Sequence, residues 1–225
     1  MDEAVADATA TASAHEIFLV VPDRPYRGDV YWMHQEVWAQ VAARRIVRSG
    51  LGGPIKSTTS PSLLFHQDGP LVRVRVSGWA LKNASTAATH LSRGAIVRVR
   101  ARLGLWREWR RNIQSHETMD EANTQVEALL GRCGLRIDDR SRAAGQPWST
   151  RPIELLQLGG SKWINASADR AASGSHHIQV TAADIDLVAE VVDPKDARGA
   201  WLNGIGRAKR LGCGMLDLTP MIART

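Results

Sequence analysis

Two short segments alternate arginine with apolar residues, and this alternation constrains the fold more than any other feature of the sequence. Residues 71–76 read Leu-Val-Arg-Val-Arg-Val, and residues 95–102 read Ala-Ile-Val-Arg-Val-Arg-Ala-Arg. A period of two predicts β-strands, in which successive side chains point to opposite faces of a sheet. Valine then occupies one face and arginine the other. The predicted arginine face consists of Arg73, Arg75, Arg98, Arg100 and Arg102.

This arginine face has two interpretations. A solvated sheet surface explains the arginines of either strand taken alone. Five arginines with no acid on the same side instead favour a polyanionic partner, because like charges held together repel each other and a polyanion relieves that repulsion. The net charge of +6 favours the same class of partner, and nucleic acid is the leading candidate.

Length and composition exclude several classes of protein. No stretch of the 225 residues approaches the ~20 apolar residues of a membrane-spanning helix. Residues 1–14 are rich in Ala and Thr, contain three acids and lack an apolar run, so we expect a disordered tail rather than a signal peptide. The two cysteines, Cys133 and Cys213, are too few and too far apart for a disulfide framework or a zinc ribbon, and they fit a reducing cytoplasm.

Hydrophobic and turn patterns predict an α+β chain whose second half is a looser copy of the first. In the first half we expect a strand at 16–22, a helix from Asp29 to about Arg48, strands at 62–66 and 71–77 around a turn at 67–70, a short helix at 85–91 and a strand at 95–102. In the second half we expect a helix at 118–130, strands near 135–138, 153–158 and 177–191, a helix capped by Asp193 with Pro194 in its first turn, and a strand at 214–218.

Two tandem ferredoxin-like (RRM-like) domains are the simplest architecture for this order of elements. The first would span residues 15–103 and the second residues 118–225, with a connector at 104–117. The connector is rich in tryptophan and arginine, which stack on bases and pair with phosphates when they are interleaved. The same pattern suits the start of an amphipathic helix whose indoles pack inward. These connector residues are Trp106, Arg107, Trp109, Arg110 and Arg111.

A glycine-rich stretch near the carboxyl end is the first of two segments that carry chemistry. Residues 204–216 read Gly-Ile-Gly-Arg-Ala-Lys-Arg-Leu-Gly-Cys-Gly-Met-Leu. The spacing fits neither a Walker loop nor a Rossmann fingerprint. A structural turn explains the first two glycines alone, whereas the interleaved cations favour anion binding by exposed backbone N–H groups. The glycines are Gly204, Gly206, Gly212 and Gly214, and the cations are Arg207, Lys209 and Arg210.

The second segment, residues 29–38, reads Asp-Val-Tyr-Trp-Met-His-Gln-Glu-Val-Trp. On a helix His34 lies beside the apolar arc of Val30, Met33 and Val37, and Tyr31 lies on the same face as His34. A histidine beside an apolar arc is commonly a core residue. At the edge of a cleft, desolvation would instead keep it neutral and ready for proton transfer.

These two segments together resemble the CasE-type CRISPR RNA-processing endoribonucleases, the subunit that matures crRNA in type I-E Cascade complexes. Residues 29–38 are similar to the first-helix Tyr-x-x-His motif of that family, and residues 204–216 are similar to its C-terminal glycine-rich loop. Leu64-Phe65-His66 is similar to the start of its second strand. The resemblance covers about residues 15–220 and implies two ferredoxin-like domains.

The resemblance also implies an activity, which is cleavage of the CRISPR repeat hairpin at the 3′ base of its stem without a metal or other cofactor. The 2′-OH of the upstream nucleotide would attack the adjacent phosphate and give a 2′,3′-cyclic phosphate and a 5′-OH end. His34 would be the general acid or base, Tyr31 would position or assist it, and Lys209 would stabilise the phosphate. The resemblance further implies that the protein stays bound to the cut hairpin as a subunit of a crRNA-guided effector complex.

The remaining candidate RNA contacts extend beyond the two motifs. They are the loop residues Gly204, Gly206, Arg207, Lys209, Arg210, Gly212 and Gly214, the strand residues Arg98, Arg100 and Arg102, the connector residues Arg107, Arg110 and Arg111, and Arg170. Arg170 lies in the loop at 165–177, where the family inserts a basic hairpin beside the stem, together with His176 and His177, which also suit an ordinary loop. Residues 100–103 read Arg-Ala-Arg-Leu where the family usually has Arg-Ala-Asn-Pro. Similar processing subunits occur in type IV CRISPR systems, and the sequence does not decide between the type I-E and type IV contexts.

Three other functions compete with this hypothesis. A catalytically inactive RNA-binding subunit would have the same fold with His34 as a core residue. A generic RNA-recognition module would expose aromatic residues on its sheet, whereas these strands expose arginine. A nucleotide-binding enzyme that uses the glycine-rich loop is disfavoured because the known fingerprints are absent.

Overall fold

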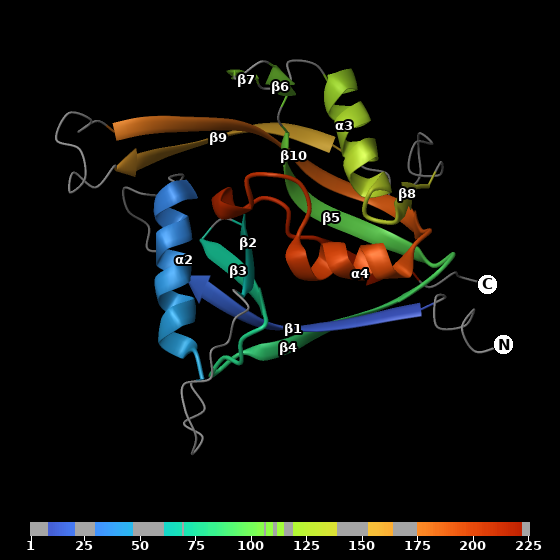
Figure 1. Cartoon of the computed structure of the whole chain (residues 1–225), viewed down its shortest axis with the longest axis horizontal. Helices are drawn as coiled ribbons and strands as arrows, with labels where there is room; N and C mark the ends of the chain where they lie inside the picture. The colour runs from blue at the N-terminus through green and yellow to red at the C-terminus, as the bar shows by residue number, and fades with distance from the viewer. Residues whose placement is uncertain are drawn as a thin grey trace.

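Two large antiparallel sheets, one small two-stranded sheet and three α-helices make up most of the described part of the chain (Figure 1). The computed structural model describes residues 9–20, 30–46, 61–68, 70–105, 107–109, 112–114, 119–138, 153–163 and 175–221. Within these residues, no helix is both long enough and apolar enough to span a membrane.

The first sheet has four strands in the order β2-β3-β1-β4. Its elements in chain order are β1 (Thr9–Val20), α2 (Val30–Arg44), β2 (Ser62–Asp68), β3 (Leu71–Ser77) and β4 (Ser85–Ser92). Met33, Val37 and Val41 of α2 are buried and belong to one core with the valines of β3, Val72, Val74 and Val76. The valine face that the alternation predicts in this strand is therefore the face that α2 covers.

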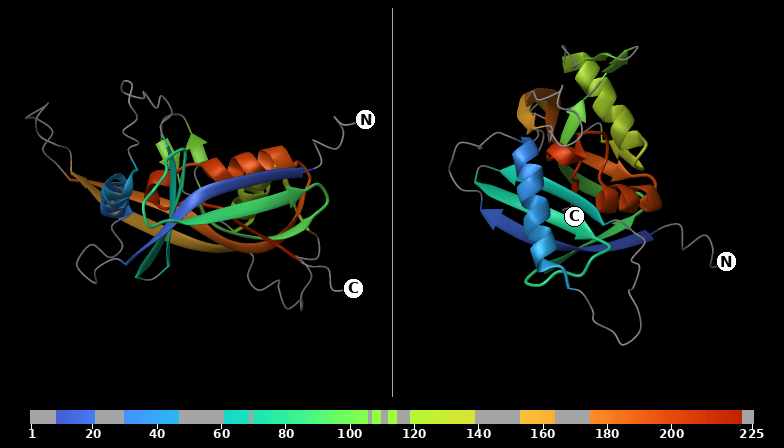
Figure 2. Two further views of the ribbon diagram at one scale, coloured as in Figure 1. Left: turned by 90° about the horizontal axis from the view of Figure 1, so that it is seen from below. Right: turned by 60° about the vertical axis from the view of Figure 1, so that its left-hand side comes forward.

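The second sheet has the order β11-β5-β10-β8, and β9 pairs with the other part of β10. Its elements are β5 (Ile96–Leu105), α3 (Met119–Gly131), β8 (Leu135–Ile137), β9 (Ile153–Trp163), β10 (Ser175–Val191), α4 (Pro194–Asn203), the 3₁₀ turn η2 (Lys209–Leu211) and β11 (Asp217–Pro220). The helices α3 and α4 pack on the face of β5 that carries Val97, Val99 and Leu103. Figure 2 shows that the long strands β9 and β10 run past the rest of the second sheet.

Both sheets follow the same plan, in which the third and first strands of the unit lie at the centre. The first unit contains β1, β2, β3 and β4, and the second contains β5, β8, β10 and β11, each in the spatial order second, third, first, fourth. This confirms an α+β fold of two tandem ferredoxin-like units. In the first unit a short loop stands where the second helix of a ferredoxin-like unit would be.

The prediction of a short helix at 85–91 is wrong, because these residues form β4. The strand pairs with β1 from Ser85 to Ser92, and its buried positions alternate near the end, at Thr89 and Leu91. Leu91 belongs, with Ala12 and Ala14 of β1, to a second core that also contains the buried residues of β5, β10, α3 and α4. A run of small and β-branched residues has weak helical preference, so this tertiary contact decides its structure.

Two other expectations about the first half need correction. The disordered tail was expected to reach residue 14, but β1 begins at Thr9 because Ala12 and Ala14 are buried against the second core. The strand predicted at 95–102 is present as β5, but it pairs with β10 and β11 of the second sheet instead of joining β3. The division into domains at 15–103 and 118–225 stays a prediction.

The locally encoded elements agree well with the sequence. Asp193 caps α4, where its Oδ1 accepts hydrogen bonds from the backbone N–H groups of Lys195 (2.9 Å) and Asp196 (3.0 Å). In the connector, β6 (Arg107–Trp109) and β7 (Asn112–Gln114) pair with each other as a hairpin, so the alternative of a helix start there is wrong. Of the other connector residues, Trp106, Arg110 and Arg111 lie outside the described residues.

Candidate active site

His34 lies on α2, beside the stripe that faces the first sheet. Its ring is half-buried and stacks against the ring of Phe65 on β2, with centroids 6.3 Å apart and planes inclined by 28°. The fully buried Met33 and Val37 flank it along the helix and fix the rotation of α2 on the sheet. The structure therefore puts the imidazole at the edge of the core, as the helical pattern predicts.

The environment of His34 favours its neutral form. Burial lowers the pKa of His34, and the positive charge of Arg210 lowers it further. Nδ1 is buried and has no hydrogen-bond partner among the described residues. An unpaired buried nitrogen is costly, and such groups concentrate where a ligand or a catalytic step uses them.

The glycine-rich loop follows α4, and a backbone hydrogen bond between its two ends closes its base. The backbone N–H of Ile205 donates to the carbonyl of Gly214 (2.9 Å), which joins the two ends of the loop. Gly214 has φ = +84°, and a Cβ there would lie 2.3 Å from the carbonyl oxygen of Ile205. Only glycine accepts both the positive φ and this close approach. The fold itself therefore requires glycine at position 214.

The loop and the histidine meet. The turn η2 packs against α2, and a Cβ on Gly212 would lie 3.0 Å from Cε2 of Phe65, the residue that stacks on His34. Arg210, which is exposed on η2, is the loop cation whose charge acts on the imidazole. The structure thus brings together the two segments, 170 residues apart in the chain, that the sequence analysis singled out.

Lys209, the cation expected to stabilise the phosphate, has a different environment. Its Nζ donates to the carbonyl oxygen of Asn203 at the end of α4 (2.8 Å). Its charge acts on Cys133 at the end of α3, where burial is the main cause of a raised thiol pKa. Arg207 forms a backbone bridge with Gly104 of β5. Of the three loop cations, Arg210 is therefore the one that these interactions associate with His34.

Several predicted site residues cannot be placed as side chains. Tyr31 lies on α2, three positions before His34, but its side chain is outside the described part of the structure. The same holds for the side chain of Arg107 on β6 and of the two histidines at the start of β10, His176 and His177. Arg170 falls outside the described residues altogether.

The arginines of β5 are not free of acids, which corrects the picture of a purely cationic face. Arg98 donates to both carboxylate oxygens of Asp186 (2.6 Å each), and Arg100 donates to the same group at 3.1 Å. Arg102 makes a two-pronged pair with Asp184 (2.7 Å each). These aspartates come from β10, the neighbouring strand, and Arg73 and Arg75 of β3 belong to the other sheet. These two arginines are also paired: Arg73 with Asp217, and Arg75 with both Glu16 and Asp217.

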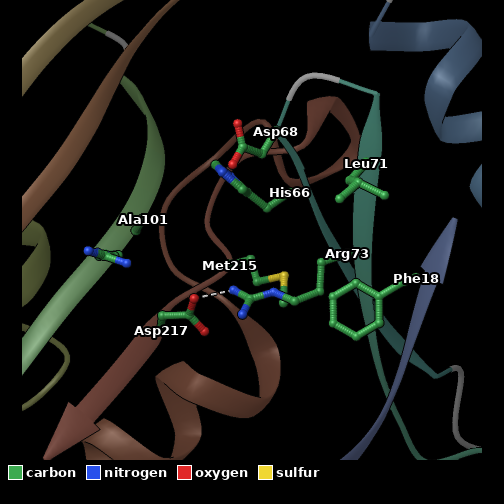
Figure 3. A pocket seen from close by; sticks show the side chains of 9 residues that line it. Phe18, His66, Asp68, Leu71, Arg73, Ala101, Met215 and Asp217 are labelled. Atoms are coloured by element: carbon green, nitrogen blue, oxygen red, sulfur yellow. Dashed lines mark hydrogen bonds and ion pairs between the residues drawn. The ribbon is translucent and has the colours of Figure 1, made fainter. Parts of the chain in front are cut away.

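A pocket that the sequence patterns had not indicated lies on the face of the first sheet opposite α2, at His66, Arg73 and Asp217 (Figure 3). The signal was present in β2, where the alternation that buries Phe65 under α2 must turn His66 to the other face. Neither in this pocket nor anywhere else in the described ranges do three His, Cys, Asp or Glu side chains gather closely enough to hold a metal ion.

The comparisons with known proteins agree with this fold. A family model described as CRISPR associated protein matches residues 19–220. A CRISPR endoribonuclease Cse3 bound to 19-nucleotide RNA superposes with a TM-score of 0.61 at 18% identity, over 94% of this chain and 100% of that chain. Thermus thermophilus Cse3 bound to an RNA representing a pre-cleavage complex superposes with a TM-score of 0.60 at 19% identity, over 92% of this chain and 99% of that chain.

A third similar structure is the CRISPR-associated protein Cas6e from Escherichia coli str. K-12, with a TM-score of 0.53 at 16% identity, over 93% of this chain and 100% of that chain. At these identities the similarity establishes the shared fold. None of the curated proteins matches the sequence.

Proposed function

We propose, from the premise that the chain belongs to the family of CRISPR associated proteins, that it is an endoribonuclease that binds and cleaves CRISPR repeat RNA. The observation that carries the proposal is the meeting of His34 with the glycine-rich loop and its cation Arg210. A proton-transfer group beside a cationic loop suits a reaction in which a phosphodiester gains negative charge. The RNA-bound structures of similar fold support RNA as the substrate.

The proposed reaction needs a base, a source of a proton for the leaving oxygen, and a cation at the phosphate. A base takes the proton of the 2′-OH, the 2′ oxygen attacks the adjacent phosphorus, and the bond from phosphorus to the 5′ oxygen breaks. The departing 5′ oxygen takes up a proton from solvent water, so the products are a 2′,3′-cyclic phosphate and a 5′-OH end. His34 suits the role of base because its lowered pKa keeps the imidazole neutral near pH 7.

The cation at the phosphate would come from the loop. Arg210 is the stronger candidate by position, and Lys209 would hold the RNA backbone. The backbone N–H groups of Gly204, Gly212 and Gly214 already donate to carbonyl oxygens of the protein, so they are not available to phosphates as the sequence suggests. Tyr31 would assist or position His34 from the same helix. We propose that no metal takes part, and that the protein acts in the cytoplasm and keeps the cut hairpin as a subunit of a guide complex. The similarity to a chain of a CRISPR RNA-guided surveillance complex supports the last point.

The test is cleavage of an end-labelled repeat hairpin in the presence of EDTA, followed by identification of the new ends. We expect a 2′,3′-cyclic phosphate and a 5′-OH, and a loss of about 10²–10⁴-fold in rate for His34→Ala with hairpin binding retained. A 3′-OH end, or cleavage that EDTA abolishes, contradicts the proposed mechanism.

One observation favours a second candidate, an RNA-binding subunit without activity. The ring of His34 is half-buried and stacked on Phe65, which also suits a core histidine. Tight hairpin binding by the wild-type protein, with no cleavage under any of these conditions, would select this alternative.

A further inference from the structure

A second concave site lies on the face of the first sheet opposite α2, between the two sheets (Figure 3). It has a volume of about 290 Å³. It is separate from the candidate active site, because Phe65 and His66 are consecutive on β2 and point to opposite faces. The ring of Phe65 contacts His34, whereas His66 lines the pocket.

One wall of the pocket is a row of three side chains across the first sheet. Phe18 of β1 and His66 of β2 are both register partners of Arg73 on the central strand β3. With neighbouring strands about 4.8 Å apart, this row spans roughly 10 Å. An aromatic ring, a guanidinium and an imidazole thus lie side by side on one sheet face.

The aromatic member of the row is unusually exposed. Phe18 is 63% exposed, and two further large apolar side chains beside it, Val20 (75%) and Leu71 (48%), are also exposed. Val20 and Leu71 are register partners, one row further along the sheet. Exposed apolar side chains that gather at a pocket mark a binding surface more often than a solvated one.

The charges of the pocket nearly cancel. Arg73 is ion-paired with Asp217 on the facing sheet, and Asp68 and Arg100 complete the charged lining. Burial and the nearby Arg102 lower the pKa of His66, so that its ring is neutral. Two guanidinium groups therefore face two carboxylates. A phosphate alone gains little from such a site, whereas a flat polar ring gains stacking on Phe18 and hydrogen bonds to His66 and Asp68.

We propose that this pocket binds one unpaired nucleotide of the RNA, with its base stacked on Phe18 and its edge read by His66 and Asp68. The volume is at the lower limit of small-ligand pockets, so it suits a single nucleotide and excludes an RNA duplex or a protein helix. Sequence-specific RNA recognition acts on unpaired bases in this way, by stacking and edge contacts. The inference rests on the proposed function. It adds a second contact with the RNA, on the face of the first sheet opposite His34.

The experiment compares two RNAs with the full-length protein. One is the bare repeat hairpin and the other is the same hairpin with unpaired flanks, one of which carries the fluorescent base 2-aminopurine. In the wild type we expect the flanks to tighten binding about tenfold, within the range of one base–aromatic stack, and the 2-aminopurine fluorescence to be quenched. Phe18→Ala should reduce this advantage to twofold or less and remove the quenching.

The control is Ile46→Ala, which removes an exposed apolar side chain just beyond the end of α2, away from the pocket lining and from the exposed cluster at Phe18. It should keep the tenfold advantage. If the flanks give no advantage in the wild type, or if both variants lose it equally, the pocket proposal is overturned while hairpin binding still supports the proposed function. If the wild type binds neither RNA, both are overturned. Unchanged RNA binding by Phe18→Ala, with loss of association with another protein subunit, assigns the pocket to a protein and also overturns the proposal.

Discussion

Arg75 shows how far the environment of a single residue can depart from its pattern in the sequence. Its side chain is 2% exposed. It donates to Glu16 (2.8 Å), to the carbonyl of Leu216 (2.7 Å) and to Asp217 (3.3 Å), and its guanidinium lies 3.9 Å from the ring centroid of Trp201. The residue therefore joins the first sheet to α4 and to the end of the glycine-rich loop, and it is not available to a polyanion.

Replacing Arg75 by Leu should destabilise the protein by about 3–5 kcal/mol, because Glu16, itself 8% exposed, is left as an unpaired buried charge. Urea unfolding measures this. The control is Arg136→Ala on the exposed pair with Glu190, for which the change should stay within about 1 kcal/mol. Equal effects from the two variants would mean that burial adds nothing to the Arg75 network.

A second prediction at this scale concerns the pH dependence of cleavage. As a base, His34 works only when neutral, so the rate falls as pH drops through its pKa, which burial and Arg210 hold below the ordinary value of 6.5. Arg210→Gln removes the cation that disfavours the imidazolium, so the pKa of His34 rises and the acidic limb of the pH–rate profile moves upward towards 6.5.

Lys209→Gln is the matched control for this shift, because it removes the same charge from the neighbouring position while its ammonium is bound to Asn203. The acidic limb should stay in place in this variant. A downward shift in Arg210→Gln, or the same shift in both variants, contradicts the assignment of Arg210 as the cation that acts on His34.

At the scale of elements, the base of the glycine-rich loop can be tested through two glycines of different surroundings. Gly214→Ala forces a Cβ to within 2.3 Å of the carbonyl oxygen of Ile205 at a positive φ, so we expect a loss of more than about 1 kcal/mol in stability and a fall in cleavage rate. Gly199→Ala, inside α4 with no atom within 4 Å of the new Cβ, should instead stabilise the protein by about 0.5–1 kcal/mol. Chemical unfolding and a cleavage assay measure both. A tolerated Gly214→Ala would mean that the loop does not need its closed base.

Elements whose causes are local could be predicted from the sequence, and those decided by distant partners could not. The cap of α4 depends on Asp193 and the two residues after Pro194, and the alternation of β3 and β5 is a property of each strand alone. Residues 85–92 have no strong local preference, so only their pairing with β1 makes them a strand. The aspartates of β10 that neutralise β5 lie more than 80 residues away, and strand order alone reveals them. His34 and the loop could be identified by resemblance, but the choice of Arg210 over Lys209 needed geometry.

At the scale of the whole molecule, the second sheet places the arginines of β5 beside the aspartates of β10, and these pairs have two possible roles. Three guanidinium groups, on Arg98, Arg100 and Arg102, face two carboxylates, on Asp184 and Asp186, which leaves one net positive charge. Arg100 is the most exposed of the three, at 57%. Either these pairs hold β5 to β10, or they restrain cations that RNA can take over.

Asp186→Asn separates these possibilities, because it removes the carboxylate that holds both Arg98 and Arg100. If RNA reaches this face, the variant binds the hairpin several-fold more tightly at low salt. The log–log dependence of the binding constant on salt should steepen by about 0.7–0.9 for each additional phosphate contact. Stability should fall only slightly, because the pair is partly exposed and Asn still accepts a hydrogen bond. Unchanged affinity and an unchanged salt slope would assign the β5 arginines to the architecture and leave the loop cations as the contacts with the RNA backbone. The measurement is a titration of labelled hairpin at several salt concentrations, with Asp196→Asn on α4, outside these pairs, as the control for loss of one negative charge.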